Sequence, residues 1–285
     1  MSDFQLDYAV PAADLSEYIT LFYYFRADVP VFEDSERADH AQLRVRLSPG
    51  GAEYRFPDES IQTPADFHII GPTSGPMHVR VAGPVEVFGM GVTAAGWAAM
   101  IGSEASSVLN RTIDASVPFG AARLKATATA LREATDNAAR FAIGEALVRD
   151  LVREGDEQAC RFVRQVDGWL AASLSPEMDD LVAVTGLSRR QVERKCNAMY
   201  GAPPKLLARK YRALRAAVAL VADGEDVDDV IGRGFYDQSH LIREVKQFTG
   251  LTPRQIKAEP GVLQRMTIHR RTALGGQVSP LISGT

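Results

Sequence analysis

The sequence predicts an α+β protein in which a β-rich domain precedes an all-α domain. Up to about residue 118, short apolar runs are broken by Gly- and Pro-rich turns, for example at residues 48–51. Residues 121–153 contain no proline and are dense in Ala, Leu, Arg and Glu, which favours helices. Beyond residue 160, a unit with helical spacing occurs twice at an offset of 49 residues.

Within the front part, apolar and polar residues alternate at residues 43–47 and 78–81, as they do in half-buried strands. We also expect helices at residues 14–24 and 94–101, and connecting helices over residues 119–153. The front part is therefore a sheet domain that ends in helices.

Composition places the chain among soluble globular proteins. It has 285 residues, 46% hydrophobic and 24% charged, which is enough for two domains with cores of their own. The longest apolar run, residues 216–222, is too short to cross a bilayer, and residues 1–20 lack a leader pattern, so we expect a cytoplasmic protein that contacts no membrane. Because the only cysteines are Cys160 and Cys196, no disulfide framework or thiolate metal site is predicted, and we expect no cofactor.

Charge is segregated along the chain although the net charge is only −4. Residues 1–180 carry 15 basic and 27 acidic groups, whereas residues 181–260 carry 14 basic and 9 acidic groups. Residues 187–215 contain nine Lys or Arg and a single acid, Glu193. Such density is typical of a phosphate-binding face or of a solvated helix surface.

Each copy of the repeat predicts a helix, a tight turn and a second, capped helix. Residues 188–191 match the Ser-x-x-Gln capping box, which starts the second helix of the first copy. Both second helices end in Gly-x-x-Pro, at residues 201–204 and 250–253. Two helices joined in this way form the helix-turn-helix motif that binds DNA.

The second helix of each copy has an apolar stripe that should face inward and a polar face that should point outward. The inward stripes are Val192, Cys196, Met199 and Tyr200 in the first copy, and Leu241, Val245 and Phe248 in the second. The residues expected to contact double-stranded DNA are Arg189, Arg190, Glu193, Arg194, Asn197, Lys205, Gln238, Ser239, His240, Ile242, Arg243 and Lys246. Because Arg can pair with guanine and Gln with adenine, the unlike outward faces predict an asymmetric site.

A long helix beginning at Pro204 and ending at Gly224 should join the two units. A rigid connector would fix the separation of the second helices, so that both enter successive major-groove segments on one face of the DNA. The basic residues expected on its flanks are Arg209, Lys210, Arg212 and Arg215.

Residues 180–256 resemble the DNA-binding domain of the AraC/XylS family of bacterial transcription regulators. Gly-Phe-Tyr-Asp-Gln-Ser-His-Leu-Ile-Arg-Glu-Val-Lys at 234–246 and Gly-Leu-Thr-Pro at 250–253 carry most of the resemblance, and residues 188–194 with Gly201 and Pro204 carry the rest. The front domain resembles, more weakly, the β-rich, cupin-like sensor domains of such regulators.

The resemblance implies a regulator that reads bases with the outward residues of both second helices and responds to a small-molecule effector. It also implies a homodimer, with RNA polymerase as a partner if the protein is an activator. The base-reading positions carried over are Arg190, Glu193 and Arg194 in the first unit, and Gln238, Ser239, Ile242 and Arg243 in the second.

The second unit departs from the family pattern. The helix before Gly234 is one residue shorter than usual, with Ile231 where alanine is typical, and this predicts two units of equal length. Cys196, Leu241 and Val245 stand where the family often has aromatic residues. A second unit that binds DNA only weakly is therefore an alternative.

The expected boundaries are a sensing and dimerisation domain at residues 1–155, the DNA-binding domain at 160–258, and a flexible tail at 259–285. The domains should separate at Gly155 and Asp156, and the tail has few apolar residues to bury.

Arg44 and Arg46 lie two apart on a predicted strand, and Arg80 is expected on another strand of the same sheet. They could clamp an anionic effector, or they could be exposed arginines that pair with the surplus acids of this domain.

Two rivals belong to other classes. His40, His68 and His78 invite a cupin-like metalloenzyme, but only residues 66–68 have useful ligand spacing. A DNA-repair methyl-transfer protein would need a zinc-bound thiolate near the front, and no cysteine precedes Cys160. We expect a regulator and not an enzyme.

Overall fold

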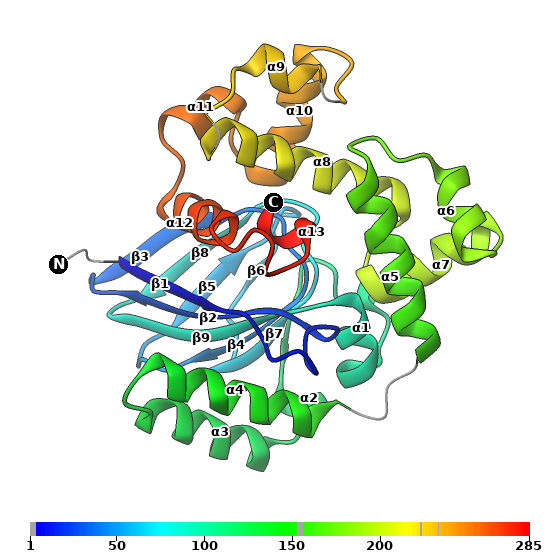
Figure 1. Ribbon diagram of the computed structural model, residues 1–285. Coiled ribbons are helices and arrows are strands. Elements are labelled where there is room, and N and C mark those ends of the chain that lie inside the picture. The colour runs from blue at the N-terminus through cyan, green and yellow to red at the C-terminus, as the bar shows by residue number, and fades with distance from the viewer. Residues whose placement is uncertain (1–3, 153–156, 223, 233) are drawn as a thin grey trace.

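The computed structural model describes residues 4–152, 157–222, 224–232 and 234–285. Within these residues, ten strands form two antiparallel sheets (Figure 1). The six-stranded sheet has the order β1 (Phe4–Ala9), β2 (Ile19–Ala27), β9 (Val85–Val92), β4 (Gln42–Arg46), β7 (Phe67–Ile70), β10 (Thr112–Asp114). The four-stranded sheet has the order β3 (Val31–Glu36), β8 (Met77–Ala82), β5 (Ala52–Arg55), β6 (Ile61–Gln62).

Helical segments follow the strands. The front domain contains α1 (Ala94–Gly96), a π-helical turn at Trp97–Ile101, a 3₁₀ turn at Ala105–Val108, α2 (Ser116–Phe119), α3 (Ala121–Glu133) and α4 (Asn137–Leu151). The remaining helices are α5 (Glu157–Ala172), α6 (Met178–Thr185), α7 (Arg189–Tyr200), α8 (Pro204–Val221), α9 (Val227–Ile231), α10 (Gln238–Thr249), α11 (Pro253–Ala258), α12 (Val262–Thr272) and α13 (Pro280–Ser283). The α+β fold class is confirmed, as are the helices expected at residues 94–101 and 119–153.

Strand β2 is buried on both faces. Phe22 packs toward α3 and α4, whereas Tyr23 and Phe25 pack between the two sheets. Gly144 lets α4 approach closely, because a Cβ there would lie 2.6 Å from Phe88 Cζ. The expected helix at residues 14–24 is wrong, because a strand begins at Ile19. A fully buried strand is a continuous apolar run, and such a run has no periodicity that distinguishes it from a buried helix.

The helix-turn-helix units occupy the two ends of α8, with α6 and α7 at one end and α9 to α11 at the other (Figure 1). The units are unequal, because α6 has 8 residues and α9 has 5. The expectation of equal length is wrong. Helix α9 ends before Gly232, and the chain then turns to place Phe235 in the same core as Val230.

The tail at residues 259–285 forms two helices and buries apolar side chains, although the sequence predicts little burial there. Helix α12 returns to the front domain, where Leu263 joins the core between the sheets, and Leu281 of α13 joins the core of α5 and α8. The apolar residues of the tail were too few to predict burial, but Leu263 and Leu281 each pack against a surface that lies far away in the sequence. The domain boundary expected at residues 155 and 156 lies outside the described residues.

Among the described helices, none has the length and apolar character needed to span a membrane.

Candidate nucleic-acid interface and effector cavity

Both second helices begin with a side-chain cap. The backbone N–H of Ser188 donates to Gln191 Oε1 at 2.9 Å, and Ser188 Oγ accepts from the Gln191 N–H, which completes the predicted capping box of α7. Asp237 Oδ1 accepts from the His240 N–H at 2.7 Å and starts α10. Gly201 and Gly250 end the two helices with φ of 74° and 82°, a conformation that favours glycine. The repeat therefore produces two helices with matching ends.

The predicted inward stripes are confirmed, with Met199 and Tyr200 half-buried against the core at the end of α7. Val192 and Cys196 of α7 are fully buried, as are Leu241, Val245 and Phe248 of α10. Burial raises the pKa of the Cys196 thiol to about 12, so this residue stays neutral within the core. Each second helix is thus held to its unit by one apolar side.

The opposite side of each second helix is exposed. The exposed residues among those expected to contact DNA are Arg189, Arg190, Glu193, Arg194, Lys205, Gln238, Ser239, Ile242, Arg243 and Lys246. Arg189 also lies 3.2 Å from Asp179 across the turn. Arginine, amide and hydroxyl groups presented in this way can donate to base edges and to phosphates.

Two expected contact residues are held by their own units. Asn197 Nδ2 donates to the backbone oxygen of Glu193 at 2.9 Å. His240 Nδ1 accepts from the Tyr236 N–H at 3.2 Å, and His240 Nε2 lies 3.3 Å from Glu244 Oε1. Asn197 and His240 therefore stabilise their own helix-turn-helix units through these contacts.

Most cations expected on the flanks of α8 point inward. Lys210 is buried against the front domain, and Arg215 Nη2 donates to the backbone oxygen of Leu170 at 3.0 Å. Arg209 and Arg212 both bind Glu244 of α10. The free basic surface is therefore smaller than the charge count of residues 187–215 suggests.

Glu244 is the structural residue that sequence reasoning missed. Its side chain is 2% exposed and accepts from Arg209 Nε at 2.7 Å and from Arg212 Nε and Nη2 at 2.9 and 2.7 Å. Helical phase offered a signal, because Glu244 is the one acid beside the inward stripe residues Leu241 and Val245. The pairing fixes α10 on the connector α8.

Tyr236 is a second residue that sequence reasoning missed. Its side chain is 92% exposed in the turn between α9 and α10. The only signal in the sequence was its place inside the family motif.

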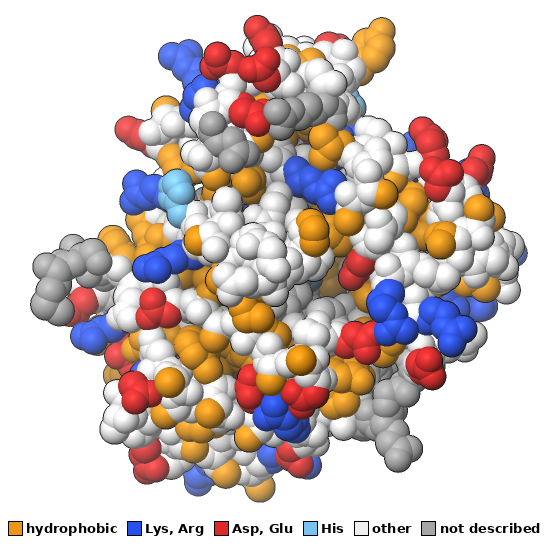
Figure 2. Space-filling model, in the orientation of Figure 1, with side chains coloured by type: hydrophobic (Ala, Val, Ile, Leu, Met, Phe, Trp, Pro, Cys, Tyr) orange, Lys and Arg blue, Asp and Glu red, His pale blue; other side chains and the backbone are white. Residues whose placement is uncertain are grey.

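Helix α8 determines the spacing of the two units. Its 18 residues span about 27 Å, somewhat less than the roughly 34 Å of one DNA turn. Acidic side chains gather on the surface of both helix-turn-helix units (Figure 2). Asp179 and Asp180 lie in the first turn of α6, and Asp228 and Asp229 lie in the first turn of α9. These acids stabilise the helix N-termini.

The front domain contacts the C-terminal ends of α7 and α10. A Cβ on Gly201 would lie 3.1 Å from Pro72 Cγ, and one on Gly250 would lie 3.2 Å from Pro76 Cβ. The outward residues of the N-terminal halves, such as Arg190 and Gln238, stay exposed.

The arginines expected to bind an effector do not converge. Arg44 faces a cavity of about 80 Å³ between the sheets, where Nη1 and Nη2 donate to Glu36 at 2.8 and 2.5 Å. Arg46 pairs with Asp66, and Arg80 pairs with Glu33 at 3.7 Å. The expectation that Arg80 shares their sheet is wrong, because β4 and β8 belong to different sheets.

Residues 181–259 match the family model described as "Helix-turn-helix domain". A search of the curated proteins returns no match.

Among solved structures, the chain is similar to ToxT from Vibrio cholerae O395, with a TM-score of 0.45 and 11% identity over 91% of this chain and 100% of that one. ToxT bound to (E)-4-(8-methylnaphthalen-1-yl)but-3-enoic acid has a TM-score of 0.45 and 10% identity over 89% and 98%. The AraC-like transcriptional activator CuxR has a TM-score of 0.31 and 11% identity over 81% and 92%.

The two capped helices, their exposed polar faces and the family match define residues 181–259 as a helix-turn-helix domain, a class of domain that binds DNA. The match confirms a helix-turn-helix domain at residues 181–259, and the resemblance to the AraC/XylS family stays a prediction.

Proposed function

We propose that this protein regulates transcription by reading an asymmetric operator with both helix-turn-helix units. The observation that carries the proposal is the pair of exposed faces on α7 and α10, which the Glu244 pairing and the connector α8 hold in fixed relation. Arg190, Glu193 and Arg194 read one half of the site. Gln238, Ser239, Ile242 and Arg243 read the other.

Lys205, Lys246 and Arg189 extend the same surfaces and supply phosphate contacts that position the protein but carry no sequence information. Asn197 and His240 act by supporting the recognition helices, as their hydrogen bonds indicate.

Selection of binding sites from random duplexes by the full chain tests the proposal. The selected sequences should share a motif, and fluorescence anisotropy should show at least ~100-fold tighter binding to it than to a scrambled duplex. Lys125→Ala, on the exposed surface of α3, is the matched control and should bind like the unchanged protein. Selection that yields no shared motif would refute sequence-specific regulation.

We further propose that the cavity between the sheets receives a small-molecule effector. Its support is an interior that contains buried charged groups and lies beside the contacts between the front domain and α8 and α10. An effector changes DNA binding only through unequal affinity for the DNA-competent arrangement and the alternative one. Operator affinity measured with and without candidate effectors tests this proposal.

The proposal includes a homodimer and, for an activator, contact with RNA polymerase. Sedimentation of the operator complex should give two protein chains per site, and one chain per site would contradict the dimer.

A further inference from the structure

A second cavity, of about 400 Å³, lies where the front domain meets the first helix-turn-helix unit, and we call it the junction cavity. Its polar wall contains Asp167 of α5, Tyr200 of α7 and Tyr211 of α8. Its apolar wall includes Ile19 of β2, Ala95 of α1 and Val163 of α5. Among the described residues, it has no lining residue in common with the cavity between the sheets.

Asp167 is an acid of this wall without a cationic partner. Tyr200 Oη donates to Asp167 Oδ1 at 2.8 Å. Within the described residues, nothing donates to Oδ2, and no Lys, Arg or His nitrogen lies within 4.0 Å of this carboxylate. Lys210 of α8 donates instead to the backbone oxygen of Asp39 at 3.3 Å. Burial raises the pKa of Asp167 to about 6, so the group is mostly ionised at pH 7 and leaves a negative charge unbalanced.

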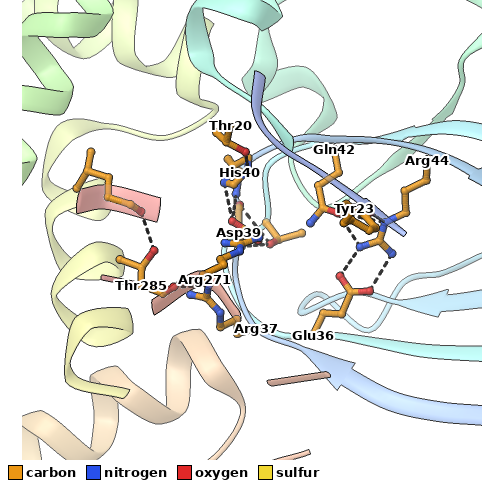
Figure 3. A network of polar contacts seen from close by, with 12 residues as sticks. Thr20, Tyr23, Glu36, Arg37, Asp39, His40, Gln42, Arg44, Arg271 and Thr285 are labelled. Atoms are coloured by element: carbon orange, nitrogen blue, oxygen red, sulfur yellow. Dashed lines mark hydrogen bonds and ion pairs between the residues drawn. The ribbon is translucent and has the colours of Figure 1, made fainter. Parts of the chain in front are cut away.

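The other charged groups of the junction cavity are paired. Arg164 of α5 binds Glu17 across the boundary between the domains. His40 lies between two partners, with Nδ1 2.6 Å from Asp39 Oδ1 and Nε2 2.9 Å from Thr20 Oγ1 (Figure 3). Burial lowers the pKa of His40 although Asp39 acts against it, so this ring supplies no positive charge at pH 7. The carboxylate on α5 is therefore the one unpaired charge in the described wall.

Two tyrosines complete a set of hydrogen-bond acceptors beside this carboxylate. Tyr200 Oη donates its proton to Asp167 and to the backbone oxygen of Val163 at 3.2 Å, so its lone pairs stay free. Tyr211 Oη has no hydrogen-bond partner in the described part of the chain. Burial, followed by the charge of Asp167, raises the pKa of Tyr211, which keeps its hydroxyl neutral. An ammonium group has three N–H donors, and Asp167 Oδ2 and the two hydroxyl oxygens can accept them.

We propose that the junction cavity binds an organic monoamine whose ammonium group donates to Asp167 and to the hydroxyl oxygens of Tyr200 and Tyr211. A charge-assisted hydrogen bond of this kind gives Oδ2 a donor and offsets the charge of Asp167. The apolar body of the amine lies against the apolar wall. A volume of about 400 Å³ is more than twice the ~150 Å³ that holds benzene, so a ring with a two-carbon linker fits. An anionic ligand would meet Asp167 as a like charge, which disfavours it here.

Both domains form the walls of the junction cavity, so an occupant contacts both. Tyr200 is the last residue of recognition helix α7, Tyr211 lies on the connector α8, and Ile19 begins β2 of the front domain. A bound amine stabilises the arrangement in which these walls are close together, and that biases the position of the first unit. We expect operator affinity to change about fivefold or more at saturation. This effect on DNA rests on the proposed regulatory function, whereas binding of the amine does not.

Phenethylamine is the probe, because alkyl amines are protonated at about pH 7.5, and 2-phenylethanol is its neutral isostere. Phenethylamine should raise the Tm of the full chain by about 2 °C or more at saturation, whereas 2-phenylethanol should not. Phenylacetate, which has the same ring and the opposite charge, should also leave the Tm unchanged.

Variants of the polar wall test the contacts. Asp167→Asn should weaken phenethylamine binding at least about tenfold in calorimetry, because the charge is lost. Asparagine still accepts from Tyr200, so this variant should fold. Tyr211→Phe removes one acceptor and no charge, and it should weaken binding about threefold or more. Asp180→Asn is the matched control, since it removes an exposed acid of α6 in the same unit and should leave binding intact.

The inference would be overturned if phenethylamine failed to raise the Tm or if 2-phenylethanol raised it equally. Phenethylamine affinity that is unchanged in Asp167→Asn would overturn it as well.

Operator affinity separates the amine site from the proposed function. Phenethylamine that binds through Asp167 without changing operator affinity would confirm the site and contradict its coupling to DNA binding. If selection from random duplexes yielded no shared motif while phenethylamine still bound, the proposed function would fail and the amine site would stand.

Discussion

Replacing Glu244 by glutamine should destabilise the protein by about 2 to 3 kcal/mol. Breaking a buried ion pair typically costs about 3 to 5 kcal/mol, because the partner charge is left without compensation. Glu244 is 2% exposed and Arg212 is 12% exposed, so the cost of breaking the ion pair between them applies in full. Arg209 is 36% exposed and can return to water, and glutamine still accepts one hydrogen bond, so we reduce the total.

The assay is thermal unfolding at pH 7. For a chain of this size, 2 to 3 kcal/mol corresponds to a Tm lower by roughly 4 to 10 °C. Glu193→Gln is the matched control, since Glu193 is exposed on α7 and its loss should change stability by less than about 0.5 kcal/mol. If the Tm of Glu244→Gln lay within about 1 °C of the Tm of the unchanged protein, the pairing would be refuted as the element that fixes α10.

The pH dependence of stability gives a second test of the ion pairs that Glu244 forms. Burial alone would raise the pKa of Glu244, but the hydrogen bonds from Arg209 and Arg212 outweigh it and lower the pKa below 4.5. A lowered folded pKa gives stability that is present above pH 4.5 and is lost as the pH falls through the folded value. The difference between Glu244→Gln and the unchanged protein should therefore shrink in acid, and a constant difference would contradict the pairing.

Three further predictions follow from the interface and its supports. Arg194→Ala should weaken binding to the selected site by about 1 to 3 kcal/mol with a smaller loss on random duplex, and equal losses in anisotropy would make Arg194 a phosphate contact. The logarithm of the operator binding constant should fall with the logarithm of salt concentration with a slope of about −3 to −5, and a slope near zero would contradict the basic surfaces. Burial raises the pKa of Asp167, which accepts from Tyr200 Oη, to about 6, so the contribution of this one group to the wild-type Tm should fall as the pH rises from about 4 to 6. Asp167→Asn should remove that fall, and parallel Tm curves for the two proteins would contradict it.

Local signals predicted the recognition helices well. The capping box of Ser188 and Gln191, the inward stripe of Val192 and Cys196 and the terminating glycines are all encoded within one or two turns of helix. Helical period and cap chemistry are enough to place such elements. The base-reading roles of the outward residues stay predictions.

Long-range pairings could not be predicted from the sequence. Lys210 was expected on a basic flank, but its burial depends on the loop at Asp39, 171 residues away. Leu263 was assigned to a flexible tail because nothing near it in sequence shows that the sheets offer it a site. The buried cluster of Arg37 and Arg271 likewise exists only after α12 has folded back.

The most direct test of the central claim is a position-resolved measurement of DNA selectivity for Arg194→Ala and Arg243→Ala. Each variant is challenged with a library of single-base changes in the selected site. We expect Arg194→Ala to relax selectivity in one half of the site and Arg243→Ala to relax it in the other, with the affected positions centred about one DNA turn apart. Loss of selectivity at the same positions in both variants, or in the Arg194→Ala half alone, would contradict reading by two units.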